Sequence, residues 1–482
     1  MKIAIISPFA TVNPHFEMEL ELAQQHLDAG DEVKYFSCTG QLSNCDFNTS
    51  KDTDRCNECT LRREMGLKLL SASVNNRPFD APFVQLSEPP SELRVRFDNV
   101  EQLIAYRIDE FDIGYAALSS LVSVVRDPEP DLTRHGPLLQ RFLESAWQTY
   151  RFTRSLLKSQ NNDRPFDRVY TFNGRFAAMR AVLRACEAEG VDCFLHERGC
   201  DKDHYELFKN HLPHDISEIN KSIGRLWNAA DPVTRQTTGE AWFLDRINRV
   251  ETSWKSFVTG QDQGALPAGF DHDRRNVALF CSSDDEFVAI GDCWRNELYP
   301  NQVTAVEQIS ASLQQSDSQI HLWVRVHPNL IGVENQRKRD MLNLSFPNVT
   351  IIAPEDKVDT YALMKAADIT ASFGSSVGIE AVFWQRPSVL LGPCLYQHLP
   401  GPVRSTSHQH TIELLTSTLE PAEKTGALQY GFWFQTRGFA YQHYAAKTLF
   451  EGTFDGHLVY PKPKPSPFKR FKQRLRKALS IN

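Results

Sequence analysis

The stretch Ala367-Asp-Ile-Thr-Ala-Ser-Phe-Gly-Ser-Ser-Val-Gly-Ile-Glu-Ala381 carries the pattern that decides the fold. Its residues 369–372 predict a short buried strand. A turn of small residues follows, and the apolar spacing of residues 378–384 predicts a helix. A strand that passes through a tight turn into a helix is typical of an α/β domain with a parallel sheet.

The same alternation continues on both sides of this stretch. Further strands are predicted at 277–281, 321–326, 349–352 and 388–391, with helices at 302–314 and 360–367. Short strands that alternate with helices imply right-handed crossovers within one parallel sheet. The preceding segment, 259–275, is rich in Gly, Asp and Pro and is predicted to be a linker. The resulting domain spans 276–460.

A second α/β pattern occupies residues 1–258. Strands are predicted at 2–8, 32–38, 168–172 and 192–196, with helices at 15–29 and 175–189, a Cys-rich loop at 38–59 and a helical insertion at about 98–160. The fold class is therefore α/β, with two Rossmann-like doubly wound domains that face a cleft. In such sheets, ligands bind beyond the carboxyl ends of the strands.

The composition restricts the class of protein. Hydrophobic residues make up 41% and charged residues 23% of the 482 residues, as in ordinary globular proteins. The net charge of −7 argues against general nucleic-acid binding. The N-terminal MKIAIISPF reads as a buried strand and not as a signal peptide, and no run is apolar for long enough to span a membrane. We therefore expect a cytoplasmic protein.

The C-terminal tail, 461–482, has a different character. It holds eight Lys/Arg and no Asp/Glu, and Pro alternates with other residues at its start. Its apolar residues have helical spacing among the cations: Phe468, Phe471, Leu475 and Leu479. This pattern favours an interfacial helix on the anionic inner surface of the plasma membrane, and thus a peripheral membrane protein. The alternative is a disordered basic tail.

The stretch Trp323-Val-Arg-Val-His-Pro-Asn329 places Arg325, His327 and Pro328 at the carboxyl end of a strand. A histidine there can donate a hydrogen bond to a phosphate oxygen or, if it is protonated, offset the charge of the phosphate. The alternative is a loop histidine that only satisfies local backbone groups.

The turn Gly374-Ser375-Ser376 is a second candidate for binding an anion. Small residues let the backbone approach a ligand, and the following helix start and the hydroxyl groups favour negative charge. Glu380 lies about one turn into the helix, where it can accept a hydrogen bond from a ribose or sugar hydroxyl. The alternative is a simple helix-capping segment.

The first domain offers candidates for proton transfer. His196 and Glu197 end a predicted strand beside Arg198, and a carboxylate in this position can serve as a general base. Asn173 and Arg175, at the end of the preceding strand, are predicted to lie beside Glu197 and to contact an acceptor. The alternatives are a structural ion pair for Glu197 and a surface position for Arg175.

Four cysteines, Cys38, Cys45, Cys56 and Cys59, have the spacing C-x6-C-x10-C-x2-C. Four thiolates within 22 residues suit a closed structural zinc site, which would have no catalytic position. Free thiols and an iron–sulfur cluster are the alternatives.

Four of these motifs together resemble the bacterial capsule polysaccharide biosynthesis family, which includes 3-deoxy-manno-octulosonic acid (Kdo) transferases. They are Asn173-Gly174-Arg175, His196-Glu197-Arg198-Gly199, Arg325-Val-His-Pro328 and Ser375-Ser376-Val-Gly-Ile-Glu380. The resemblance spans about 160–395. The four-cysteine segment and the single catalytic unit depart from the Kdo transferases, which leaves the donor sugar open.

The resemblance implies the glycosyltransferase B architecture, a nucleotide-sugar donor such as CMP-Kdo, and no catalytic metal. It further implies that His327, Pro328, Ser375 and Ser376 hold the nucleotide. The leading hypothesis is transfer of a sugar to a capsule or surface polysaccharide or to a glycolipid, with Glu197 as the base. The alternatives are a CDP-polyol phosphotransferase and a non-catalytic glycan-binding or scaffold protein.

Overall fold

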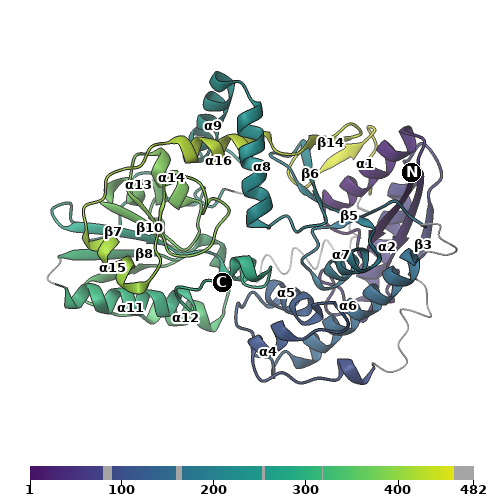
Figure 1. Ribbon diagram of the computed structural model, residues 1–482, viewed down its shortest axis with the longest axis horizontal. Helices are drawn as coiled ribbons and strands as arrows, with labels where there is room; N and C mark the ends of the chain where they lie inside the picture. The colour runs from purple at the N-terminus through teal and green to yellow at the C-terminus, as the bar shows by residue number, and fades with distance from the viewer. Residues whose placement is uncertain (80–89, 159–164, 252–255, 317–318, 461–482) are drawn as a thin grey trace, which may run out of the picture.

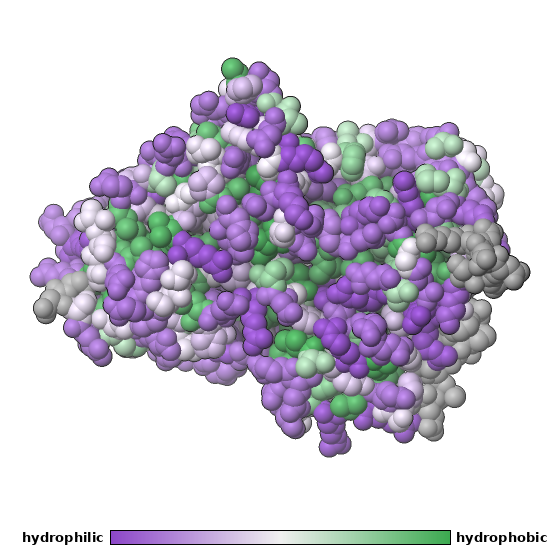
Figure 2. Space-filling model, viewed as in Figure 1, coloured by the Kyte–Doolittle hydropathy of each residue, from purple (hydrophilic) through white to green (hydrophobic). Residues whose placement is uncertain are grey.

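The computed structural model describes residues 1–79, 90–158, 165–251, 256–316 and 319–460. Two α/β domains lie side by side, each built on its own sheet (Figure 1). The fold class predicted from the sequence is confirmed. Figure 2 shows hydrophilic side chains over most of one face of the molecule, with apolar side chains gathered where the two domains meet.

The sheet of the first domain has seven strands in the order β13-β6-β5-β4-β1-β2-β3. Neighbouring strands from β3 to β5 are parallel, whereas β6 and β13 are antiparallel additions at one edge. The strands are β1 (Lys2–Ser7), β2 (Glu32–Ser37), β3 (Asn75–Pro78), β4 (Arg168–Phe172), β5 (Asp192–Arg198), β6 (His204–Lys209) and β13 (Phe439–Ala440).

Helices cover this sheet and extend it into a helical layer. The predicted insertion at 98–160 folds as three helices, α4, α5 and α6, which form an apolar cluster with α7. Continuous apolar runs in α5 explain why this helix is buried over most of its length. The helices are α1 (His15–Asp28), α2 (Thr53–Leu67), α4 (Val100–Ala105), α5 (Ile113–Val125), α6 (Gly136–Leu157) and α7 (Ala177–Glu189).

The sheet of the second domain has six strands, all parallel, in the order β12-β11-β10-β7-β8-β9. The strands are β7 (Arg275–Phe280), β8 (Ile320–Arg325), β9 (Val349–Ile352), β10 (Ile369–Ser372), β11 (Ser388–Leu390) and β12 (Val403–Arg404). The helices are α10 (Asp284–Phe287), α11 (Gln302–Gln315), α12 (Gln336–Asn343), α13 (Thr360–Ala366), α14 (Val377–Phe383) and α15 (His408–Thr416).

Three helices pack between and above the sheets: α8 (Ile216–Ala229), α9 (Pro232–Ile247) and α16 (Thr425–Thr436). The apolar faces of α8 and α9 join a cluster with α14 and α16 of the second domain. The sequence boundary at residue 258 therefore differs from the packing, because α8 and α9 bury their apolar faces against the second domain.

The chain after α16 returns to the first domain (Figure 1). β13 pairs with β6, and the hairpin of β14 (Tyr444–Ala446) and β15 (Gly452–Phe454) packs beside α1. The Glu21 carboxylate accepts hydrogen bonds from the backbone N–H groups of Gln442, His443 and Tyr444 at 2.7, 2.9 and 2.9 Å. Residues 439–460 thus belong with the first domain, whereas the sequence placed them in the second.

The remaining sequence predictions concern membrane association. No helix in the described ranges combines the length and the apolar character needed to cross a bilayer. The basic tail, 461–482, lies outside the described residues, and its proposed membrane contact stays a prediction.

Candidate functional site

A cavity of about 320 Å³ lies in the second domain, beyond the carboxyl ends of β7, β8 and β10. All the residues predicted to bind a donor line it: Arg325, His327, Pro328, Gly374, Ser375, Ser376 and Glu380. The strand-end motif and the serine turn, which are about 50 residues apart in sequence, therefore meet at one space. This position is the usual ligand site of a parallel α/β sheet.

His327 presents a hydrogen-bond donor to this cavity. Its Nδ1 accepts a hydrogen bond from the backbone N–H of Asn329 at 3.1 Å, so the neutral ring carries its proton on Nε2. Burial lowers the pKa of His327 to about 4, although Asp285 acts in the opposite direction. At neutral pH the imidazole is uncharged and can donate from Nε2 to a bound oxygen.

The turn before α14 requires glycine at its first position. Gly374 has φ +110°, and a Cβ there would lie 2.4 Å from the carbonyl oxygen of Pro393. The Tyr396 hydroxyl donates to the Ser375 carbonyl and fixes the next residue. These contacts hold the backbone and the two serine hydroxyls against the cavity.

Glu380 is buried and has three donors. Its Oε1 accepts from Arg246 Nε at 3.0 Å and from Ser376 Oγ at 2.8 Å, and its Oε2 accepts from the Tyr361 hydroxyl at 2.5 Å. The carboxylate is therefore committed to protein groups, and its role is to position Arg246. The predicted contact of Glu380 with a sugar hydroxyl gains no support from this geometry.

Arg246 is a cavity residue that the sequence reasoning missed. It comes from α9, its side chain is 40% exposed, and its Nη2 donates to Ser376 Oγ at 3.0 Å. A guanidinium that is fixed on one side and open on the other suits a phosphate group. Nothing in its local sequence distinguishes it from other helical arginines.

Arg325 lines the same cavity but uses its donors elsewhere. Only 2% of the residue is exposed, and its Nη1 and Nη2 donate to the carbonyl oxygens of Ala353 and Asp356 at 2.8 and 2.9 Å. Its side chain fastens the loop after β9. The predicted direct contact of Arg325 with a donor is thus less favoured than one with Arg246.

Glu197 lies at the end of β5 in a polar cluster. It accepts hydrogen bonds from Asn173 Nδ2 at 2.7 Å and from the backbone N–H of Arg198 at 2.9 Å. Burial raises its pKa, but the hydrogen bonds from Asn173 and from the Arg198 N–H favour the ionised carboxylate, and the pKa lies below its ordinary value. Glu197 is therefore an ionised carboxylate at neutral pH, as a general base must be.

His15 belongs to this cluster and was not predicted. It is the first residue of α1, and its Nδ1 lies 3.9 Å from Glu197 Oε1. Burial lowers its pKa to about 3, so the imidazole is neutral. The position of His15 depends on a crossing of α1 over the end of β5 that no local sequence pattern shows.

His196 does not share the position of its neighbour. It is fully buried, its ring packs against Phe172, and its Nε2 lies 3.5 Å from Glu19 Oε1. Its ring centre lies 6.4 Å from that of His15, which also neighbours Glu197, so His196 borders the same cluster from the interior. The predicted catalytic role of His196 is not supported, because the residue lies in the interior.

Arg175 connects the two domains. Its Nη1 donates to the carbonyl oxygen of Glu286 in α10 at 2.6 Å, and Glu286 lines the second-domain cavity. The ion pair of Arg126 with Asp285 adds a second link at the same interface. Arg175 thus joins the surroundings of Glu197 to the cavity, although Glu197 itself lines neither of the two cavities described here.

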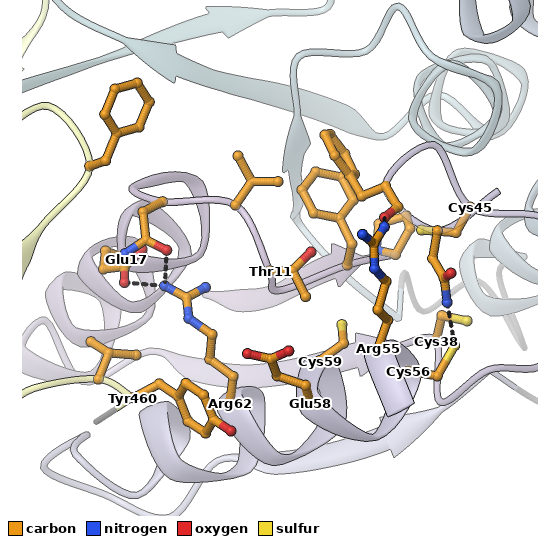
Figure 3. Close-up of a pocket in the computed structure, with 18 of the residues that line it drawn as sticks. Thr11, Glu17, Cys38, Cys45, Arg55, Cys56, Glu58, Cys59, Arg62 and Tyr460 are labelled. Atoms are coloured by element: carbon orange, nitrogen blue, oxygen red, sulfur yellow. Dashed lines mark hydrogen bonds and ion pairs between the residues drawn. The ribbon is translucent and has the colours of Figure 1, made fainter. Parts of the chain in front are cut away.

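The four predicted metal ligands line a different and larger cavity, of about 970 Å³, in the first domain. Figure 3 shows Cys38, Cys45 and Cys56 on one side of it, with Cys59 nearer its centre. The Cys38 and Cys59 sulfurs accept hydrogen bonds from the backbone N–H groups of Gly40 and Ala10 at 3.3 and 3.2 Å.

A zinc site requires that its ligand atoms lie close together, and not only that they line the same cavity. A tetrahedral zinc site with Zn–S bonds of about 2.3 Å needs sulfur atoms roughly 3.8 Å apart. Among the described residues, the group of three or more candidate ligands whose atoms all lie within 4.8 Å of one another consists of Cys200, Asp201 and His204, and no three of the four cysteines form such a group. Zinc binding by the four cysteines requires their sulfurs to move closer together and stays a prediction.

No protein-family description and no curated protein sequence match this chain. Similar solved structures include a β-Kdo 2,4-transferase, KpsC, of Thermosulfurimonas dismutans, with 11% identity, a TM-score of 0.38 and coverage of 57% of this chain and 81% of that one. At this level the likeness adds nothing to the α/β fold described above.

Two further similar structures cover more of the chain. The UDP-GlcNAc 2-epimerase of Methanocaldococcus jannaschii has 11% identity and a TM-score of 0.25, with coverage of 89% of this chain and 98% of that one. The spinosyn rhamnosyltransferase SpnG has 10% identity and a TM-score of 0.26, with coverage of 90% and 96%. These two likenesses also add nothing to the α/β fold described above.

Proposed function

We propose that this protein is a glycosyltransferase that uses a nucleotide-activated sugar. One observation carries the proposal: His327, the turn at Ser375 and Ser376, and Arg246 surround a single cavity at the carboxyl edge of a parallel sheet. A neutral imidazole donor, hydroxyl groups and a fixed guanidinium together match the oxygens of a donor phosphate.

The two domains supply different groups to the proposed reaction. Glu197 takes the proton of an acceptor hydroxyl, whose oxygen forms a bond to the anomeric carbon of the donor sugar. The bond from that carbon to the donor phosphate breaks, and the nucleotide leaves with both electrons. His327 and Arg246 stabilise the negative charge on the departing phosphate. Arg175 links the two sets of groups through Glu286.

The finer features of this proposal come from the sequence motifs. A CMP-sugar, with CMP-Kdo first, is the favoured donor because of the His-Pro and serine motifs. The acceptor is a bacterial surface polysaccharide or glycolipid. The chemistry assigned to the cavity uses side chains alone and needs no metal ion at the phosphate.

Nucleotide binding tests the proposal first. We expect CMP, and less so UDP or GDP, to raise the melting temperature of the protein. At a nucleotide concentration of one hundred times Kd, binding increases the free energy of unfolding by about 2.7 kcal/mol. His327→Ala and Arg246→Ala are expected to lose this effect, whereas His272→Ala, at an exposed position, keeps it. The proposal fails if none of the three nucleotides stabilises the wild-type protein.

Product analysis tests the reaction itself. Incubation with a CMP-sugar and a surface-glycan extract is expected to release CMP and to add the mass of one sugar to the acceptor. Addition of a polyol phosphate from a CDP-polyol would assign the cavity to phosphoryl transfer instead. Binding of nucleotide with no release of CMP from any donor would remove the assignment as an enzyme.

A further inference from the structure

The larger cavity, in the first domain, is a second binding site that the donor chemistry does not use. Its volume is about 970 Å³, which is near the upper end of small-molecule sites. It begins beyond the carboxyl ends of β1 and β2, where Phe9 and Cys38 follow the strands, and residues 445–460 cover it from the other side. Ligands of doubly wound sheets bind at this edge.

Buried polar atoms without partners point to a ligand in this cavity. Glu17 is 2% exposed; its Oε1 pairs with Arg62, but its Oε2 has no hydrogen-bond partner within the described ranges. Asn44 is 1% exposed, and neither its side-chain oxygen nor its nitrogen has a partner among the described residues. Both residues line the cavity. Buried polar atoms of folded proteins normally have a hydrogen-bond partner. These unpartnered atoms are therefore candidates for hydrogen bonds with a ligand.

The unpartnered atoms indicate the chemistry of that ligand. The carboxylate oxygen of Glu17 can only accept a hydrogen bond, whereas the amide of Asn44 can both accept and donate. Hydroxyl groups, which donate and accept, satisfy both. The rings of Phe9, Phe47 and Phe450 also line the cavity and offer apolar faces to the C–H groups of a sugar ring.

The charges of the lining argue against a nucleotide or another polyanion. Four cationic and three acidic side chains line the cavity, so its charge is nearly balanced. The Arg62 guanidinium pairs with Glu17 (Figure 3), and the Lys51 ammonium donates to the backbone carbonyls of Gly40 and Leu42. The lining is therefore suited to an uncharged ligand that is rich in hydroxyl groups.

The cavity adjoins the proposed general base. Arg198, the residue after Glu197, donates to the carbonyl oxygens of Asn13 and Leu449 at 2.9 and 2.7 Å and lies 4.9 Å from the centre of the Phe450 ring. Asn13 and Phe450 are wall residues of the cavity. Arg198 thus connects the lining of the cavity to the end of β5, which carries Glu197.

From this geometry we infer that the first-domain cavity binds an uncharged saccharide segment of the acceptor. Glu17 and Asn44 bind its hydroxyl groups, and the phenylalanine rings pack against its sugar faces. The acceptor role rests on the proposed glycosyl transfer, whereas the binding of a saccharide does not depend on it.

Two substitutions test the site in the full-length protein. Asn44→Ala removes a side chain that has no hydrogen bond in the described structure, so it is expected to weaken saccharide binding about tenfold without lowering the melting temperature. Thr11→Trp, at an exposed position that faces the cavity (Figure 3), fills the site without disturbing the core. Glu64→Gln, exposed on α2, is the matched control.

The probe is an immobilised panel of neutral and acidic bacterial oligosaccharides, with CMP binding measured in parallel. Binding of neutral oligosaccharides that is weakened in Asn44→Ala, lost in Thr11→Trp and unchanged in the control supports the inference. Equal binding by all three variants, preference for acidic oligosaccharides, or no binding by a protein that still binds CMP overturns it. Saccharide binding without nucleotide binding would support the cavity as a saccharide site. It would contradict both its role as an acceptor site and the proposed function.

Discussion

The carboxylate of Glu380 fixes the guanidinium of Arg246 at the edge of the second-domain cavity, with 3.0 Å between Glu380 Oε1 and Arg246 Nε. Glu380 is 1% exposed, whereas the arginine side chain is 40% exposed. A buried anion thus orients a cation that faces the cavity. Preorganisation of this kind reduces the cost of fixing a flexible side chain when a ligand binds.

Glu380→Gln removes the charge but keeps the shape of this anchor. We expect nucleotide affinity to fall about five- to tenfold, because Arg246 loses its fixed orientation. The melting temperature should fall as well, since the buried carboxylate accepts three hydrogen bonds. Calorimetric titration with CMP measures the first effect, and Glu413→Gln, at an exposed position, is the control. Unchanged affinity would mean that Arg246 does not contact the nucleotide.

Glu197→Gln separates binding from reaction. The amide cannot take the proton of an acceptor hydroxyl, so the rate of transfer is expected to fall about 10²- to 10⁴-fold. Nucleotide binding should stay the same, because Glu197 does not line the donor cavity. Steady-state kinetics and CMP titration give the two values. A loss of affinity with an unchanged rate would assign Glu197 to positioning instead.

Acid pH should destabilise the fold through buried histidines. Burial lowers the pKa of His15 to about 3 and those of His214 and His327 to about 4. The unfolded chain binds these protons near pH 6.5, whereas the folded protein does not. Their contribution to stability is therefore complete above pH 6.5 and is lost as the pH falls toward 4, by at most about 1.4 kcal/mol per pH unit for each histidine.

Urea unfolding at pH 7.5, 6.5, 5.5 and 4.5 measures this dependence. His15→Gln should show a shallower decrease than the wild-type protein, because one of the three histidines no longer titrates. His272→Ala, an exposed position, should follow the wild-type curve. A pH dependence that is the same in all three proteins would contradict the prediction.

The four-cysteine site predicts one bound zinc ion per chain. Elemental analysis of protein purified without chelators should give this ratio, and Cys56→Ser should reduce it to near zero. The sulfurs must approach one another for zinc to bind, so zinc is expected to stabilise the loop between β2 and α2 against proteolysis. Protein that contains no zinc and is equally resistant with and without EDTA would identify the four residues as free thiols.

The tail prediction is tested with vesicles. Full-length protein should sediment with vesicles that contain 30% anionic lipid, and less so at 0.5 M NaCl, because salt screens the basic side chains. The 1–460 protein should remain in the supernatant. Equal sedimentation of both proteins would place the membrane contact elsewhere.

Local patterns predicted much of the fold. The spacing of apolar residues placed β4, β9 and β10 at their observed bounds, because strands in a parallel sheet are short, apolar and bounded by turns. The two antiparallel strands β6 and β13 were missed. Their sequences, HYELFK and FA, are too short or too polar to stand out, and β13 forms only through pairing with β6.

The candidate site was predicted where its residues lie in sequence motifs. His327 and Ser376 were found because each follows a recognisable strand and because strand ends share one edge of a sheet. Arg246 and His15 were missed because helices bring them there from distant parts of the chain. The catalytic role predicted for His196 gains no support because the residue is fully buried, which the motif does not reveal.

The return of residues 439–460 to the first domain has a consequence for biosynthesis. The strand that completes the first sheet, and the backbone that donates to Glu21, follow the second domain in the chain. While the ribosome makes the second domain, the first one keeps an open edge at β6. The first domain therefore reaches its final form only after the second domain has been synthesised.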